Sequence, residues 1–508
     1  MKLGRRQILS LAALPALALR SGAQRRKPVF RTNPFTLGVA SGDPGSDGFV
    51  LWTRLATEPL RGGGLEEEEI DVRWEVSEDD AFRRIVRSGT AVADPRLAHS
   101  VHVEVDGLRP DRWYWYRFFA GDDGSGVGRA RTTPAPGAVS PHMSFAFASC
   151  QHFETGYYTA YRHMAAEAPD LVFHLGDYIY EGRSTPRVRA HLGGELRSLG
   201  DYRNRYALYR TDADLQAMHA SCPWVVTWDD HEVDNNYAAD VSEHPDVMRE
   251  EFLERRASAY QAYYEHMPLR AAQIPTGSSM RLYRHLDFGG LAGFSVLDTR
   301  QHRSDQPCGD RAKPPCDGMA DPRATLLGSA QRDWLFSTLR GSSAVWNVIP
   351  QQVMVAKVDR SPGEDVTYSM DQWAGYDAAR GDLLRFLEES RVRNPIVLTG
   401  DIHSNWVNDL VVDIDDPESR PVATEFVGTS ISSSGDGGPN TTYGEGVMRD
   451  NPFVKLHNAQ RGYVICDVTP RHFTARYRIL ESVTRRGAER ETLAEFAVEN
   501  GRPGAQPA

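Results

Sequence analysis

The stretch Leu171-Val-Phe-His-Leu-Gly-Asp177-Tyr-Ile-Tyr180 is the strongest indicator of fold class in this 508-residue chain. Its apolar run is typical of a buried strand, and the run stops at a Gly-Asp pair. In α/β folds, side chains that directly follow buried strands gather at the carboxyl edge of the sheet, where ligands bind. The stretch therefore predicts an α/β fold (α/β or α+β) with a polar site at the strand ends.

Three other segments repeat this pattern of a buried strand followed by polar residues. They are Val225-Val-Thr-Trp-Asp229-Asp230-His231-Glu232, Ile396-Val-Leu-Thr-Gly-Asp401-Ile-His403 and Phe145-Ala-Phe-Ala-Ser149-Cys150-Gln151. One such segment alone is usually a turn. Repetition of the pattern at four distant places predicts a shared metal site.

The residue types at these strand ends are those of metal ligands. Carboxylates combined with phenolate and thiolate suit ferric iron, and oxygen-rich Asp and Asn sites suit calcium. A carboxylate at Asp177 could bridge two ions, and two adjacent ions form a clamp for hydrolysing phosphate esters. The candidate ligands are Cys150, Asp177, Tyr180, Asp230, His231, Asp401 and His403.

Composition and length indicate a soluble globular protein with more than one domain. Apolar residues make up 40% of the chain and charged residues 25%, as in ordinary folded proteins. Residues 33–135 alternate short strands with Gly, Asp and Pro turns, which predicts an N-terminal β-sandwich. A Pro-rich boundary follows, and residues 140–495 form the predicted catalytic domain. Helices are expected at Tyr157–Glu167, Met248–Glu265, Gln331–Leu339 and Tyr376–Ser390, and residues 187–220 are also expected to be helical.

Residues 1–23 read as an export signal. Arg5-Arg6 precedes an apolar stretch from Ile8 to Leu19 that is too short to span a bilayer. The arginine pair resembles a twin-arginine (Tat) signal, and an ordinary secretory signal is the alternative. The mature protein is expected to be exported to the periplasm or beyond, with the Tat machinery as a partner and without a transmembrane segment.

The net charge limits the kinds of partner that the protein is expected to bind. The net charge is −11, and loss of the leader makes it −15 because four basic residues leave with it. This acidic surface argues against stable nucleic-acid binding by charge, although nucleotide and lipid substrates remain open.

Of five cysteines, Cys308 and Cys316 flank a short Gly/Pro loop and are expected to form a disulfide. Cys222 and Cys466 sit in apolar surroundings and read as core residues.

The motifs together resemble one family. The order Gly-Asp-x-x-Tyr, Asp-His-Glu and Gly-Asp-x-His is similar to the metallophosphoesterase (calcineurin-like) superfamily. The specific forms resemble the PhoD family of alkaline phosphatases and phosphodiesterases, which includes phospholipase D-type members. These forms are Ser149-Cys150-Gln151, Gly176-Asp177-Tyr-Ile-Tyr180-Glu181, Trp228-Asp-Asp-His-Glu-Val-Asp234-Asn235-Asn236 and Gly400-Asp-Ile-His-Ser-Asn405-Trp406.

The resemblance implies a role for each matching residue. Cys150, Tyr180 and His403 would bind Fe³⁺, Asp177 would bridge the metals, and Asp230 and Asp401 would bind Ca²⁺. His231 would lie beside the phosphate as a transition-state stabiliser or acid. Either Asn235 or Asn236 would reach calcium or phosphate. Arg300 is a candidate phosphate contact, with a structural salt bridge as an equal alternative.

The resemblance also implies the fold and the activity of the catalytic domain. The catalytic domain should be a four-layer αββα sandwich that hydrolyses phosphodiesters, and also monoesters, by attack of a metal-bound hydroxide. Phospholipid, nucleotide and teichoic-type diesters are candidate substrates. One alternative is a phospholipase D-like enzyme acting on lipid head groups. Another is a non-catalytic phosphate- or metal-binding protein. Cys150 as a nucleophile is a competing interpretation, but the sequence shows no clear His/Asn partner for it.

Overall fold

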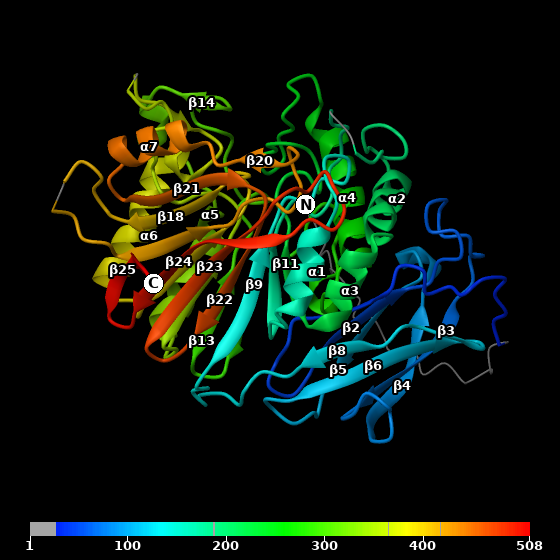
Figure 1. Ribbon diagram of the computed structural model, residues 1–508. Coiled ribbons are helices and arrows are strands. Elements are labelled where there is room, and N and C mark those ends of the chain that lie inside the picture. The colour runs from blue at the N-terminus through cyan, green and yellow to red at the C-terminus, as the bar shows by residue number, and fades with distance from the viewer. Residues whose placement is uncertain (1–26, 186–187, 364, 417) are drawn as a thin grey trace, which may run out of the picture.

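The protein has a mixed α/β fold with several sheets, as a computed structural model shows (Figure 1). The structure describes residues 27–185, 188–363, 365–416 and 418–508. The predicted signal peptide, residues 1–23, lies outside the described residues. No described helix is long and apolar enough to cross a membrane. Cys308 and Cys316 form a disulfide, and Cys150, Cys222 and Cys466 are buried free thiols.

A ten-stranded sheet and an eight-stranded sheet carry the fold. The ten-stranded sheet has the order β25-β24-β23-β22-β9-β10-β11-β1-β2-β5, with β9, β10 and β11 parallel at its centre. Apart from the N-terminal strands β1, β2 and β5, described below, this sheet consists of β9 (Met143–Ala148), β10 (Leu171–Leu175), β11 (Trp224–Thr227), β22 (Gly462–Val468), β23 (His472–Leu480), β24 (Arg490–Glu499) and β25 (Arg502–Pro507).

The eight-stranded sheet has the order β12-β13-β15-β17-β19-β18-β21-β20, and β13, β15, β17 and β19 run parallel. Its strands are β12 (Arg284–Phe288), β13 (Ala292–Val296), β15 (Trp346–Pro350), β17 (Pro395–Thr399), β18 (Asn405–Leu410), β19 (Ala423–Val427), β20 (Gly437–Gly438) and β21 (Val454–Gln460). A separate two-stranded ribbon pairs β14 (Ala312–Lys313) with β16 (Tyr368–Ser369).

One hydrophobic core joins the inner faces of the two large sheets. Phe145 and Phe173 from the ten-stranded sheet meet Phe294 from the eight-stranded sheet, with ring centroids 5.5 and 4.8 Å apart. These strands are buried on both faces and read as nearly continuous apolar runs, as parallel strands covered on both sides do. The packing of the two sheets sets the distance between their carboxyl edges.

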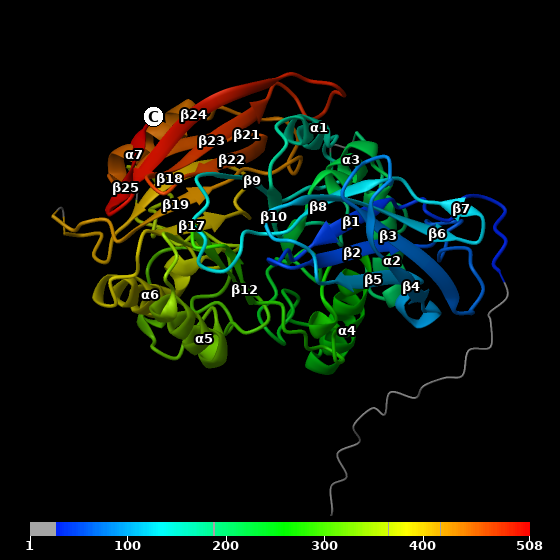
Figure 2. The same cartoon turned by 90° about the horizontal axis from the view of Figure 1, so that it is seen from below.

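Helices cover the outer faces of both sheets. The helices α1 (Thr159–Ala166), α2 (Leu199–Arg210), α3 (Ala213–Ser221) and α4 (Arg249–His266) share a core with the ten-stranded sheet. The helices α5 (Gly328–Gly341), α6 (Asp377–Glu389) and α7 (Thr441–Asp450) share one with the eight-stranded sheet, and Figure 2 shows α5 and α6 along its outer side.

The helix predictions hold for α1, α4, α5 and α6, with ends that move by one to three residues. The prediction for 187–220 is wrong in its first part, because α2 begins only at Leu199. Gly193 and Gly194 precede it, and Ser198 caps it in a reciprocal bond with Asp201. Glycine disfavours helix, so residues 188–198 form an irregular loop.

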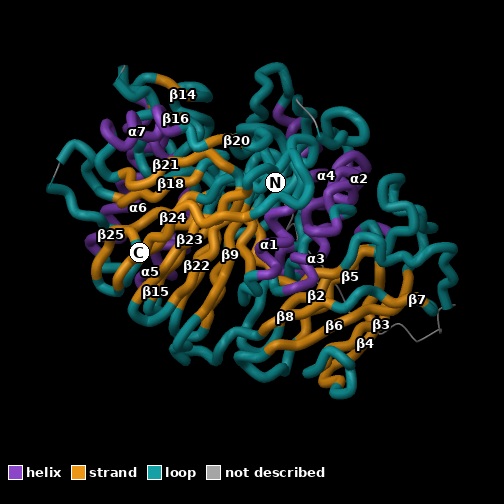
Figure 3. Tube along the Cα trace, viewed as in Figure 1, coloured by secondary structure: helices purple, strands orange, loops and turns teal. Residues whose placement is uncertain are grey.

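The N-terminal strands form two groups around a shared core that contains Leu51, Val72 and Tyr116. A five-stranded sheet holds β3 (Ile70–Ser77), β4 (Ile85–Ala93), β6 (Trp113–Ala120), β7 (Asp123–Gly124) and β8 (Gly128–Arg131). The other group holds β1 (Val39–Gly42), β2 (Phe49–Arg54) and β5 (Ser100–Val105). Because β1 pairs with β11 at Gly42 and Trp224, this group extends the ten-stranded sheet (Figure 3).

Candidate metal centre

The predicted strand ends meet at one place. Cys150 follows β9, Asp177 follows β10, Asp230 follows β11, and Asp401 and His403 follow β17. Four of these residues have left-handed backbones: Cys150 (φ 60°), Asp177 (φ 57°), Asp401 (φ 63°) and His403 (φ 55°). Non-glycine residues rarely adopt such values, and they persist where the surroundings over-determine them, often at functional sites.

A first cluster of ligand atoms joins the two sheets. Cys150, Asp177 and His403 each offer one atom, and these atoms all lie within 4.8 Å of one another. The Tyr180 hydroxyl donates to Asp177 Oδ2 (2.8 Å), lies 3.2 Å from His403 Nε2 and accepts from Ser433 Oγ (2.7 Å). Thiol, carboxylate, imidazole and phenol therefore converge on one point.

A second cluster shares Asp177 with the first. Asp177, Asp230 and His231 also offer atoms within 4.8 Å of one another. Asp177 Oδ1 is buried and has no hydrogen-bond partner among the described residues. A buried carboxylate oxygen without a partner is costly, and a cation would satisfy it. The donor set therefore fits two metal ions, with Asp177 common to both clusters.

The electrostatics of the clusters also call for positive charge. Burial, with neighbouring carboxylates, raises the pKa of Asp177 well above its usual value, although His231 opposes the shift. Burial raises the pKa of Cys150 and of Tyr180 well above their usual values, and lowers the pKa of His403 to about 3. His403 is therefore a neutral imidazole, the form that ligates metals. Cations here would favour the ionised carboxylate, thiolate and phenolate.

Asp401 belongs to neither three-residue cluster. Its Oδ2 accepts from Gln372 Nε2 (3.1 Å), and its Oδ1 lies 4.0 Å from Arg300 Nη2. Burial raises the pKa of Asp401 to about 6. The Asp401 side chain is therefore held by Gln372 and lies near Arg300, beside the two clusters.

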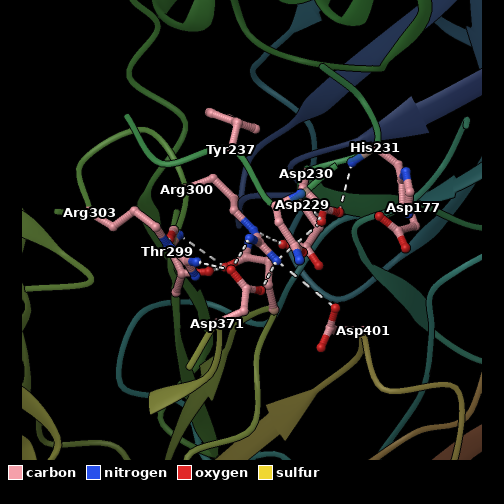
Figure 4. A network of polar contacts seen from close by, with 12 residues as sticks. Asp177, Asp229, Asp230, His231, Tyr237, Thr299, Arg300, Arg303, Asp371 and Asp401 are labelled. Carbon is pink, nitrogen blue, oxygen red and sulfur yellow. Dashed lines mark hydrogen bonds and ion pairs between the residues drawn. The ribbon is translucent and has the colours of Figure 1, made fainter. Parts of the chain in front are cut away.

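Arg300 lies beside Asp229, Asp230 and Asp371 in a buried network of ion pairs (Figure 4). It is fully buried; its Nε donates to Asp229 Oδ1 (2.5 Å) and its Nη1 to Asp371 Oδ1 (2.8 Å). Its Nη2 lies 3.5 Å from Asp230 Oδ2. These contacts favour the salt-bridge alternative over direct contact with phosphate. Buried arginine pairs this well with carboxylates because its planar fork bonds several at once.

His231 is oriented by a carboxylate that sequence reasoning did not assign. Its Nδ1 lies 2.7 Å from Glu181 Oε2, and Glu181 Oε1 accepts from the Asn235 backbone N–H (3.0 Å). Burial tends to lower the pKa of His231, but Glu181, Asp230 and Asp177 outweigh it and raise the pKa well above its usual value. The remaining ring nitrogen, Nε2, is the one free to face a substrate.

Glu232 is a second residue without a role in the sequence reasoning. Its carboxylate accepts backbone N–H bonds from Asp177 (3.1 Å), Tyr178 (2.5 Å) and Asp229 (2.9 Å). Glu232 therefore ties together the turns that follow β10 and β11. Its place in the Asp-Asp-His-Glu motif is the signal that could have revealed it.

The two candidate asparagines differ in their surroundings. Asn235 contributes its backbone N–H to Glu181. Asn236 donates its backbone N–H to Asp230 Oδ2 (2.8 Å) and its side-chain Nδ2 to Asp310 Oδ2 (2.8 Å). Asn236 is therefore the one tied directly to a candidate metal ligand.

A cavity of about 510 Å³ opens beside His403. Its wall includes Arg360, Ser361, Ser404 and His457, and Ala312 from β14. A third group of possible ligands, Glu195, Asp234 and His244, lies apart from this cavity. Arg255 Nη1 already pairs with both carboxylates of this group, at 3.0 Å from Asp234 and 3.1 Å from Glu195.

Facing sheets that bring two ligand clusters, with one carboxylate in common, to their strand ends are typical of metal-dependent hydrolases, phosphoesterases among them. Residues 145–477 match the PhoD-like phosphatase family, and residues 21–134 match the N-terminal domain of PhoD-like phosphatases. The chain is 51% identical to alkaline phosphatase D of Bacillus subtilis (strain 168) over 502 residues, which is 98% of this chain and 86% of that protein. It belongs to the PhoD-like phosphatase family and is a phosphoesterase.

The fold agrees with this assignment. A solved structure described as "Structure of PhoD" superposes with a TM-score of 0.92 at 51% sequence identity. The match covers 95% of this chain and 93% of the other. The two structures therefore share one fold over nearly their whole lengths.

Proposed function

We propose that the enzyme hydrolyses phosphodiesters and phosphomonoesters at a pair of metal ions, Fe³⁺ and Ca²⁺, bridged by Asp177. The observation that carries the proposal is the shared carboxylate: two ligand clusters meet at Asp177, whose Oδ1 has no partner among the described residues. Cys150, Tyr180 and His403 would hold the iron. Asp230, Asp401 and Asn236 would hold the calcium, and His231 of the second cluster would face the phosphoryl group instead of binding the ion.

When bound, the ions would activate a water molecule and neutralise phosphoryl oxygens. The chain's own residues do the rest. His231, held at Nδ1 by Glu181, presents Nε2 to the phosphoryl group or the leaving oxygen. A group held this way can donate a hydrogen bond or a proton as negative charge develops. The positive charge of Arg300 offsets the negative charges of Asp229 and Asp230, so these two carboxylates can lie side by side.

We extend the proposal to the architecture. The helices on each outer face and the core between the sheets support a four-layer αββα catalytic domain over residues 140–495. The core between the two N-terminal strand groups supports a β-sandwich over residues 33–135. The sandwich shares strands with the large sheet, so the two domains would act as one mechanical unit.

Export is a further part of the proposal. The Arg5-Arg6 pair before a short apolar stretch supports Tat transport to the periplasm or beyond. The Cys308–Cys316 disulfide agrees with an oxidising compartment. Replacing both arginines with lysine and fractionating the cells tests it: the variant should stay inside the cell.

The central test is hydrolysis of bis(p-nitrophenyl) phosphate by the purified, leader-free enzyme, with calcium and then with a chelator. We expect calcium-dependent turnover that chelator abolishes and added calcium restores. Turnover that persists in a chelated sample free of calcium and iron would contradict the metal mechanism. Inactivity towards this diester combined with activity towards a monoester would restrict the proposal to monoesters.

A further inference from the structure

Asn236 is held at three separate points. Its backbone N–H donates to Asp230 Oδ2 (2.8 Å), its carbonyl accepts from Gln306 Nε2 (2.9 Å), and its Nδ2 donates to Asp310 Oδ2 (2.8 Å). Its φ is 48°, a left-handed value that asparagine tolerates better than most residues. A residue held on its donor, its acceptor and its side chain has little freedom to move.

The contact with Asp310 decides which way the amide of Asn236 faces. An ionised carboxylate only accepts hydrogen bonds, whereas the amide carries a donor group on one edge and an acceptor on the other. Turning the amide over would place Asn236 Oδ1 against Asp310 Oδ2, which is repulsive. The Nδ2 edge therefore stays with Asp310, and Oδ1, the atom by which asparagine binds hard cations, is left free of that carboxylate.

Asp310 lies in the loop that the Cys308–Cys316 disulfide closes. The loop contains β14, which pairs with β16 from a later segment, and the Met370 N–H of that segment donates to the Arg311 carbonyl (3.0 Å). Arg311 has a φ of 74°, unusual for a bulky residue, so the loop needs such constraints to keep its shape. Gln306, just before the disulfide, grips the carbonyl of Asn236 and also donates to Asp371 Oδ1 (2.8 Å).

We propose that Asp310, presented by the disulfide-closed loop 308–316, is a positioning residue that orients Asn236 to bind the calcium ion held by Asp230. This inference rests on the proposed function. Asp310 acts through Asn236 and needs no contact with the substrate. The calcium affinity of the site would thereby depend on the Cys308–Cys316 disulfide, which begins about seventy residues after Asn236 in the chain.

Calcium binding to the purified iron-loaded enzyme, measured by isothermal titration, tests the proposal without relying on activity. Asp310→Ala should weaken calcium affinity by about tenfold, since loss of residues that orient metal ligands typically costs 10- to 100-fold. Asp310→Asn keeps an acceptor for Asn236 and should fall between wild type and Asp310→Ala. In assays, Asp310→Ala should need about tenfold more calcium for half-maximal rate, with kcat restored at saturating calcium.

The matched control is Asp317→Ala, which removes an exposed carboxylate that makes no hydrogen bond or ion pair with any described residue. It should bind calcium like the wild type. If it weakens binding as much as Asp310→Ala, the effect is one of general charge and the inference is overturned. The double variant Cys308→Ser/Cys316→Ser should weaken binding in the same direction. Substitution is preferable to a reductant, which would also act near Cys150.

Asn236→Ala separates failure of this inference from failure of the proposed function. If Asn236→Ala weakens calcium binding and Asp310→Ala does not, Asp310 has no positioning role and the proposed function stands. If neither variant changes calcium affinity, the assignment of Asn236 as a calcium ligand is wrong, and the inference falls with it.

Discussion

The two ligand clusters share Asp177 but are built in different ways. The first draws Cys150 and Asp177 from the ten-stranded sheet and His403 from the eight-stranded sheet. The second draws Asp177, Asp230 and His231 from two neighbouring strands of the ten-stranded sheet alone. The first cluster therefore depends on how the two sheets pack. The second depends on local turns that Glu232 ties together.

The donors differ as well as the scaffolds. The first cluster offers thiol, phenol and imidazole around the shared carboxylate, a set that suits ferric iron. The second is richer in carboxylate, has Arg300 behind it and suits calcium. On the proposed function, one shared aspartate would serve two ions because each cluster supplies the rest of its ligands separately. Variants that remove the shared residue, one cluster, the oriented imidazole or a residue outside both should rank in that order.

Asp177→Asn should have the largest effect, because it removes the residue common to both clusters. We expect loss of both ions and a fall in kcat/KM of about a thousandfold, or roughly 4 kcal/mol of transition-state stabilisation. Elemental analysis and bis(p-nitrophenyl) phosphate hydrolysis measure these outcomes. Asp106→Asn, at an exposed aspartate directly after β5, is the control. Full metal content in Asp177→Asn would show that the carboxylate is not the bridge.

Cys150→Ala and Asp230→Ala should each break one cluster and spare the other. Cys150→Ala should lose iron and still bind calcium, whereas Asp230→Ala should lose calcium and retain iron. Each should lower activity by about 300-fold, because a single remaining ion stabilises less of the developing charge. Iron content by elemental analysis and calcium affinity by titration distinguish them. If both variants lost both ions together, the clusters would be one cooperative unit.

His231→Gln should leave both metals in place and lower kcat by about a hundredfold, the lower range for loss of a positioned acid or donor. Glu181→Gln removes the carboxylate that orients the ring, so a smaller loss of about tenfold is expected. Steady-state kinetics beside metal analysis checks both. A His231→Gln enzyme with unchanged kcat would remove His231 from the chemistry.

The sequence revealed residues whose position follows from one strand alone. Asp177 and Cys150 could be placed because an apolar run followed by a polar residue fixes where a side chain emerges. Arg300 could not be placed, because its partners Asp229 and Asp371 come from segments that only the packed fold brings together. Asp310 was missed for the same reason.

Errors in the fold prediction have equally specific causes. The Tyr- and Arg-rich composition of 187–220 suggested one helical region, but the glycines before Ser198 delay α2 to Leu199. The alternation in 33–135 predicted strands correctly but carried no information on pairing partners. The pairing of Gly42 with Trp224 joins β1 to the large sheet, and no local pattern specifies such a pairing.

His174 lies outside both clusters and provides the smallest predicted effect. It is fully buried in β10, and neither ring nitrogen has a hydrogen-bond partner among the described residues. Burial lowers its pKa to about 3, as burial also does for His403. In the unfolded chain the pKa is near 6.5. Between these values the unfolded chain binds a proton that the folded protein does not, so stability falls as the pH falls.

This linkage predicts that His174 alone lowers the free energy of unfolding by about 2 kcal/mol between pH 7 and pH 5. His174→Leu should remove that part of the slope, as measured by denaturant unfolding at both pH values. Metal loss at low pH affects both proteins alike and cancels in the difference. His472→Leu, at an exposed histidine, should leave the slope unchanged. An equal slope in wild type and His174→Leu would mean that His174 is protonated in the folded protein, or that another group bears the pH dependence.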